Sequence, residues 1–332
     1  MMAGLPELSV ILVTPDDFAT VRRTFQHLRV QTIADRIEVV LVAPRAADIV
    51  AGAGELDGFH SVQVVETGAA ITSSAAARAV GIRAANAPVV ALGEDHSFPD
   101  PGWAAALLSA HARGHAVVGP TVRNGNPDTM LSWANLLLEY GPWLDPADAG
   151  PAEHLPGHNS SYKRELLLSY GDELPRRMQV ETTLQQELAA QGHTLLRTAD
   201  ARTAHLNFSV FLPSLSLRFL GGRLFASGRA RGWSAGKRAM YTLGAPLIPL
   251  VRLRRMLRTM ARVPEQRALM PRILPMLGLT LLVDAAGELV GYALGAGRSD
   301  VQLSAIEFRR PRFLNARDRA EYDAALQRMI GT

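Results

Sequence analysis

The sequence contains no cysteine among its 332 residues. This absence excludes a disulfide framework, a thiolate zinc site and a cysteine nucleophile. The first residues, Met1–Glu7, also lack the basic segment and apolar core of a secretory signal. We therefore expect no cleaved signal, and a cytoplasmic location by default.

Negative charge is scarce in one part of the chain. Residues 213–275 hold 13 Lys and Arg but a single acidic residue, Glu265, whereas residues 1–212 hold 15 basic and 23 acidic residues. We therefore predict an acidic catalytic domain over 1–212 and a separate basic, apolar region over 213–332. A basic segment beside an acidic domain indicates an anionic partner, either nucleic acid or an anionic membrane.

No Gly-x-Gly-x-x-Gly follows the first apolar run, which argues against a Rossmann dehydrogenase. The first 120 residues instead alternate β-branched runs with helical stretches, which predicts an α/β fold with a mostly parallel sheet flanked by helices. The predicted strands are Leu8–Thr14, Ile37–Ala43, Ser61–Glu66, Pro88–Leu92 and Ala116–Gly119. The predicted helices are Asp17–Gln31, Thr72–Asn86, Pro101–Arg113 and Gln179–Gln191.

The C-terminal region has a different pattern, which predicts mainly helix. Over Leu250–Val263 a helical wheel separates an aliphatic arc from a basic arc, formed by Arg252, Arg254, Arg255, Arg258 and Arg262. Such opposed faces are typical of a helix that lies in a membrane interface.

The apolar run that follows, Ile273–Val283, is about half the length that crosses a bilayer. We therefore predict a peripheral or monotopic protein on the cytoplasmic face of the membrane. A helix packed on the catalytic domain, with its arginines solvated, is the alternative. Scattered aromatics supply few stacking platforms, so we expect no nucleic-acid partner.

Three consecutive polar residues, Glu94, Asp95 and His96, follow the predicted strand Pro88–Leu92. Ligands of parallel sheets bind at the carboxyl ends of the strands, where these side chains lie. Carboxylate oxygens with one imidazole suit Mg²⁺ or Mn²⁺. The segment therefore predicts a divalent-cation site, although acidic turns are also common without an ion.

Several short segments together resemble the family 2 glycosyltransferases, which have the GT-A fold. Glu94–His96 stands where that family has its Asp-x-Asp metal motif. The other matching segments, in order, are Gln31–Thr32, Ala77–Ile82, Pro101–Trp103, His158–Glu165, Gly171–Glu173, Glu181 and Ala204–His205. The order and spacing carry the resemblance, which covers about residues 8–207.

The resemblance implies transfer of a sugar from a nucleoside diphosphate to an acceptor hydroxyl, with inversion. Together with the membrane-seeking C-terminal region, it suggests a lipid-linked or envelope glycan acceptor. It implies a cation held by Glu94, Asp95 and His96, with His205 as a further ligand or a hydrogen-bonded strand-end residue. Glu181 is the implied base, or else a helix cap. Thr14, Pro15, Asp17 and Arg78 are expected at the nucleotide, and His158, Asn159 and Trp103 at the acceptor. The last three also have structural interpretations, as turn residues and as a core tryptophan.

Among the departures from the family pattern, two concern nucleotide recognition and the base. Ala43-Pro44-Arg45 replaces the aspartates that follow the second strand, and Thr182 replaces the aspartate of the base motif. These departures motivate a second hypothesis, a catalytically silent GT-A scaffold at the membrane.

Overall fold

The protein is described here by a computed structural model, which covers residues 4–261 and 263–330. Two of the expectations above involve residues outside the described ones. These are Met1–Ala3, part of the segment Met1–Glu7 in which no signal is expected, and Arg262 of the basic arc. The chain forms two compact units. Unit 1 comprises residues 1–123, 145–205 and 326–332, and unit 2 comprises 124–144 and 206–325. The predicted domain boundary after residue 212 therefore falls inside helix α8, Phe211–Arg229.

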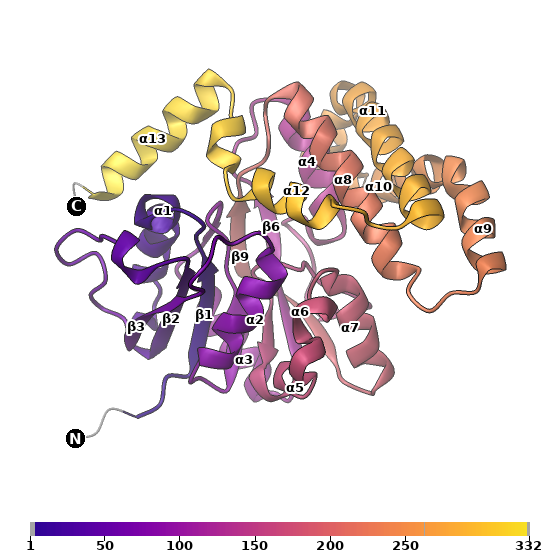
Figure 1. The fold of residues 1–332 in the computed structure, drawn as a ribbon. Helices are drawn as coiled ribbons and strands as arrows, with labels where there is room; N and C mark the ends of the chain where they lie inside the picture. Colours follow the sequence, from indigo (N-terminus) through magenta and orange to yellow (C-terminus); the bar gives the residue numbers. More distant parts are fainter. Residues whose placement is uncertain (1–3, 262, 331–332) are drawn as a thin grey trace. The chain divides into compact units, whose positions relative to one another are not determined.

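Unit 1 is built on a nine-stranded sheet in the order β3-β2-β1-β4-β8-β6-β9-β5, with β7 paired to β9 (Figure 1). The strands are β1 Leu8–Val13, β2 Ile37–Ala43, β3 Ser61–Glu66, β4 Val89–Leu92, β5 Ser97–Pro99, β6 Val117–Asn124, β7 Gly150–Pro151, β8 Ser161–Lys163 and β9 Leu195–His205. Strands β1 to β4 pair in parallel, whereas β8 runs antiparallel to both β4 and β6. The α/β class is confirmed, but the sheet is mixed. A strand that returns antiparallel needs no crossover helix, so the alternation used for prediction does not reveal it.

Helices cover both faces of the parallel part of the sheet. Side chains alternate between the faces of a strand, so neighbouring residues of β1 contact different helices. Leu8, Val10 and Leu12 share one core with α1, Phe18–Arg29, and α3, Trp103–Ala112. On the opposite face α2, Ser74–Ala84, lies so close that a Cβ on Gly81 would be 2.6 Å from Ile11 Cγ2. The remaining helices of this unit are α5 Arg164–Leu168, α6 Leu174–Arg177 and α7 Glu181–Ala190.

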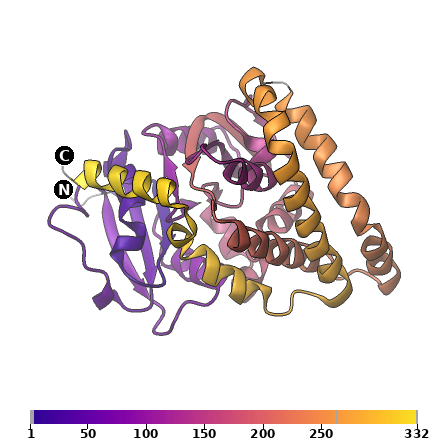
Figure 2. The same cartoon turned by 90° about the horizontal axis from the view of Figure 1, so that it is seen from above.

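Unit 2 is helical. Its helices are α4 Met130–Tyr140, α8 Phe211–Arg229, α9 Ala235–Gly244, α10 Ile248–Met260, α11 Pro264–Leu294 and α12 Ser299–Glu307; α13, Ala316–Ile330, begins here. Glycines let α8 and α11 lie against each other (Figures 1 and 2). A Cβ on Gly287 would be 2.1 Å from the carbonyl oxygen of Phe219, and one on Gly222 would be 2.2 Å from that of Asp284. Backbone contact at this distance is possible only because both residues lack a side chain.

Within the described residues, α11 alone has the length and mean hydropathy of a membrane-crossing helix, and 44% of its most apolar window is buried. Length and composition are weak evidence, because a core helix passes the same test. Asp284 and Glu288 of α11 are buried, and both pair with Arg252 of α10, Glu288 at 3.3 Å. These ion pairs hold α11 against α10 within unit 2.

Candidate active site

The carboxyl end of β4 positions the acidic segment. Gly93 follows the strand and donates its N–H to Ile11 O at 2.9 Å, and a Cβ there would be 2.6 Å from Leu12 Cδ2. On the far side, Ser97 of β5 lies opposite His205 of β9. Both ends of the segment are therefore fixed by sheet contacts. Glu94, Asp95 and His96 between them are buried, although turn residues of this kind are usually exposed.

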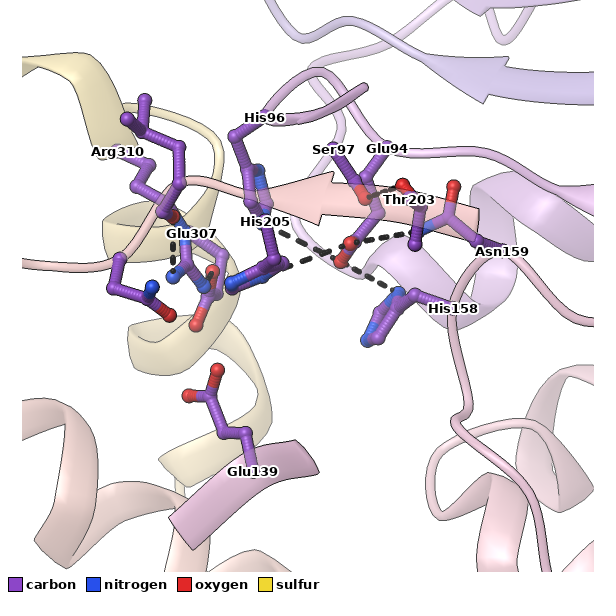
Figure 3. Close-up of polar contacts among 12 residues, drawn as sticks. Glu94, His96, Ser97, Glu139, His158, Asn159, Thr203, His205, Glu307 and Arg310 are labelled. Atoms are coloured by element: carbon purple, nitrogen blue, oxygen red, sulfur yellow. Dashed lines mark hydrogen bonds and ion pairs between the residues drawn. The ribbon is translucent and has the colours of Figure 1, made fainter. Parts of the chain in front are cut away.

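Glu94, His96 and His205 form a cluster that can hold a metal ion (Figure 3). One potential ligand atom from each lies within 4.8 Å of the others. His96 Nε2 is 3.4 Å from Glu94 Oε1, and His205 Nε2 is 3.8 Å from Glu94 Oε2. Metal–ligand bonds are about 2.1 Å long, so two ligands of one ion lie at most about 4.2 Å apart. The two separations meet this limit, and a donor set of two imidazoles and a carboxylate suits a divalent transition ion better than Mg²⁺.

Asp95 supports this cluster from behind. Its Oδ1 lies 2.5 Å from His96 Nδ1, on the side of the ring opposite to Nε2. A carboxylate at this nitrogen fixes the orientation of an imidazole ligand. The other oxygen, Oδ2, is buried and accepts no hydrogen bond from any described residue. Of the predicted ligands, Asp95 thus contacts His96 and is not one of the three clustered groups.

The charge state of Glu94 is set by its neighbours. Burial alone would raise its pKa, but His158 and His96 outweigh this through their positive charge and their hydrogen bonds. They hold the pKa of Glu94 well below its usual value. His158 Nδ1 is 2.8 Å from Glu94 Oε1. The buried carboxylate is therefore ionised, as a metal ligand must be.

A chain of contacts links this cluster to the predicted base. His158 Nδ1 is also 2.5 Å from Arg78 Nη2, and Arg78 Nη1 is 3.0 Å from Glu181 Oε1. With Nδ1 protonated, His158 donates to Glu94; without the proton, it accepts from Arg78. Gly157 leaves room for Glu181, since a Cβ there would be 2.9 Å from Glu181 Cδ. Glu181 begins α7, but its side chain is largely buried and paired with Arg78, so it is not a solvated cap.

The predicted nucleotide residues lie at the same edge of the sheet. Thr14 follows β1, donating its N–H to Val42 O at 2.9 Å and its hydroxyl to Asp17 O at 2.8 Å. Asp17 is the N-cap of α1 and accepts from Thr20 N at 3.3 Å. Pro15, between them, is half-buried. Because β1 and β4 are adjacent and parallel, this loop and Glu94 both follow the carboxyl ends of neighbouring strands.

The predicted acceptor residues do not share one environment. Asn159 has a φ of 58°, in the left-handed region that asparagine tolerates, and donates its Nδ2 to Glu94 Oε2 at 3.4 Å. This turn presents His158, whose side chain is 32% exposed. Trp103 is 1% exposed and lies in the unit 1 core. Of the two interpretations of Trp103, acceptor contact and a core role, the structure therefore favours the core role, because neither face of its indole ring is exposed.

Two residues of the site were not singled out from the sequence. Gly93, just before Glu94, lets the chain pass close to Leu12 of β1. The sequence feature that could have identified it is a glycine directly after an apolar strand. Thr24 donates its hydroxyl to the carbonyl oxygen of Glu94 at 2.8 Å from 70 residues away in the chain. A lone threonine in a helix gives no local signal for such a contact.

Comparisons with known proteins agree with this fold. The family model described as glycosyl transferase family 2 matches residues 9–171. The solved mannosyltransferase PcManGT from Pyrobaculum calidifontis, in complex with GDP-Man and Mn²⁺, is 14% identical with a TM-score of 0.50; the match covers 86% of this chain and 88% of that one. The S. aureus TarS 1–349 structure with UDP is 15% identical with a TM-score of 0.45, covering 86% and 90%. No curated protein matches the chain significantly. At these identities, structural likeness concerns the fold alone.

Proposed function

Because residues 9–171 belong to glycosyl transferase family 2, the chain is a nucleotide-sugar glycosyltransferase, and we propose that it works by metal-dependent inverting transfer. The observation that carries this proposal is the buried cluster of Glu94, His96 and His205 at the carboxyl end of β4. A cluster of ionisable groups without a ligand is costly to bury, which is typical of a functional site.

The three residues would hold a divalent cation, for which we propose Mn²⁺. Bound there, the cation would supply positive charge to the departing diphosphate. That the P. calidifontis mannosyltransferase was solved with GDP-Man and Mn²⁺ supports this choice. Asp95 would keep His96 in a ligating orientation. Thr14, Pro15 and Asp17, at the neighbouring strand end, would line the nucleotide.

In the proposed reaction an acceptor hydroxyl oxygen attacks the anomeric carbon and forms the new glycosidic bond. The bond from that carbon to the diphosphate breaks, and its electron pair leaves with the nucleoside diphosphate. The acceptor proton passes to Glu181, which Arg78 holds in place through an ion pair at 3.0 Å. Attack opposite to the leaving group inverts the anomeric centre.

We further propose a lipid-linked or envelope glycan acceptor, reached from the cytoplasmic face of the membrane. The charge of the chain supports this, since 13 of its basic residues lie in 213–275 with one acidic residue. His158 and Asn159, next to Glu94, would hydrogen-bond the acceptor or the transferred sugar.

Calorimetric titration of UDP-, GDP- and dTDP-sugars, with Mn²⁺ and with chelator, tests the donor site. We expect metal-dependent binding of one nucleotide class, weakened by His96→Ala. If none of these donors binds with or without metal, the transferase proposal fails and a silent scaffold explains the chain better.

Turnover of the bound donor then tests the base. We expect Glu181→Gln to lower turnover by about 10²-fold or more while donor affinity is kept. Glu187→Gln, on the same helix, is the matched control, because Glu187 pairs with Arg177 outside the cluster. Equal turnover in Glu181→Gln and wild type would remove Glu181 from this role.

A further inference from the structure

Unit 2 exposes a row of large apolar side chains along α9, the 3₁₀ turn Ala245–Leu247 and the start of α10. We call this row the apolar ridge; it consists of Met240, Leu243, Leu247, Leu250 and Val251, which are 57–83% exposed. Single exposed apolar residues are normal on protein surfaces. Met240, Leu243, Leu247 and Leu250 recur every three or four residues, and Val251 adjoins Leu250, so the five follow one another along α9, the 3₁₀ turn and α10.

Positive charge flanks the apolar ridge at both ends. Lys237 precedes it by one turn, and the exposed Arg254, Arg255 and Arg258 continue the outward side of α10. The sequence supplies no aspartate or glutamate between Pro213 and Pro264. This positive charge is therefore not balanced by any carboxylate of its own stretch, and it is complementary to an anionic surface.

The opposite side of α10 is not available for binding. Met256 and Met260 are buried, and Leu253 and Leu257 are only partly exposed. Arg252, assigned to the solvated basic arc by the helical wheel, instead pairs with Asp284 and Glu288. Apart from Leu250 at its edge, which is 66% exposed, the aliphatic arc predicted to enter a membrane is therefore mostly used for packing inside unit 2. On α10, the apolar side chains exposed for a membrane contact are those of the ridge, Leu250 and Val251.

Aromatic rings of α9 and its neighbours pack on one another beside Lys237. Trp233 stacks on Tyr292 of α11 at 5.8 Å with an interplanar angle of 8°, and Tyr241 of α9 lies 4.5 Å from Trp233. Lys237 Nζ lies 4.3 Å over the Trp233 ring. Tryptophan and tyrosine beside basic residues are typical of protein segments at the headgroup level of a bilayer.

We propose that the apolar ridge inserts into the headgroup–acyl boundary of an anionic bilayer, with Lys237, Arg254, Arg255 and Arg258 at the lipid phosphates. Helices of this kind bind through buried apolar area together with attraction to anionic lipid. This membrane contact would bring the protein to the lipid-linked acceptor proposed above, and to that extent the inference rests on the proposed function. Vesicle binding itself requires neither donor nor turnover.

Co-sedimentation of the full chain with vesicles tests the proposal. We expect binding to phosphatidylglycerol–phosphatidylcholine vesicles and much weaker binding to phosphatidylcholine alone. Each of Leu243→Glu and Leu247→Glu should lower the partition coefficient by at least about tenfold. The double change Arg254→Gln with Arg258→Gln should also lower it, by about fivefold for each charge, and reduce its salt dependence.

Val50→Glu is the matched control, since Val50 is 73% exposed but lies in unit 1. A control that loses binding as strongly as Leu247→Glu would overturn the proposal, as would wild-type protein that binds an oligonucleotide but no vesicle. Calorimetric donor titration of the same protein separates the two proposals. A protein that binds a donor but no vesicle would contradict the membrane surface and leave the proposed enzyme function standing.

The absence of cysteine allows a second, site-specific measurement. Leu247→Cys and Val50→Cys each introduce a single thiol for an environment-sensitive dye. We expect a blue shift of emission on anionic vesicles for the label at 247 and none for the label at 50. An unshifted spectrum at 247 on vesicles that bind the protein would show that the ridge stays in water, which contradicts insertion.

Discussion

Two adjacent glycines of α8 should respond in opposite directions to the same substitution. A Cβ on Gly222 would lie 2.2 Å from the carbonyl oxygen of Asp284 in α11, while one on Gly221 has no atom of a neighbouring segment within 4 Å. Alanine gains about 1 kcal/mol over glycine in a helix interior. Gly221→Ala should therefore stabilise unit 2 by about that amount.

Gly222→Ala has the same gain in helix propensity. Its added Cβ must, however, push the backbones of α8 and α11 apart by about 1 Å to reach an ordinary contact distance. Overpacking usually costs about 1–3 kcal/mol, and the upper end applies because a backbone carbonyl cannot rotate away. The net effect is a destabilisation of about 2 kcal/mol, so the paired variants differ by about 3 kcal/mol.

Urea unfolding followed by circular dichroism measures this difference as a shift in midpoint at constant slope. The same contrast holds on α11 between Gly287, 2.1 Å from Phe219 O, and Gly278, which has open space. Gly222→Ala with Gly287→Ala should cost less than the sum of the single changes, because either one already separates the helices. A Gly222→Ala variant as stable as Gly221→Ala would refute the close approach of α8 and α11.

Burial, and next to it the charge of Asp284, raises the pKa of Glu288 to about 7. Between about pH 4.5 and about pH 7 the unfolded chain has lost this proton and the folded chain keeps it, so stability falls as pH rises, by at most about 3 kcal/mol. Glu288→Gln should remove this fall in unfolding midpoints measured across the window, and an unchanged profile would contradict the assignment. Burial lowers the pKa of His111 to about 4, so stability is lost as pH falls from about 6.5 to about 4. His111→Gln should therefore flatten the acid limb, and a variant as acid-sensitive as wild type would count against it. His205→Ala should weaken calorimetric Mn²⁺ affinity at least about tenfold, whereas His193→Ala, outside the cluster, should leave it unchanged; equal loss in both would exclude His205 as a ligand.

Local sequence patterns were sufficient for most elements of unit 1. The five predicted strands correspond to β1, β2, β3, β4 and β6, and the predicted helices to α1, α2, α3 and α7, with ends that differ by a few residues. Hydrophobic patterns predict these elements because each helix buries one periodic face against its neighbours, and the central strands are buried on both faces. Three antiparallel strands, β5, β7 and β8, escaped prediction because they have only two or three residues each. The 11-residue strand β9 was also missed.

The sequence by itself determined that Glu94 and His96 follow a buried strand and that residues 213–275 are strongly basic. Only the tertiary structure brought His205 to Glu94, through the pairing of β5 with β9, and Arg78 to Glu181, 103 residues away. It also buried Trp103 and turned the aliphatic side of α10 inward, leaving the apolar ridge exposed. Periodicity tells which side chains share a face, but what covers that face depends on segments far away in the chain, and no local pattern records them.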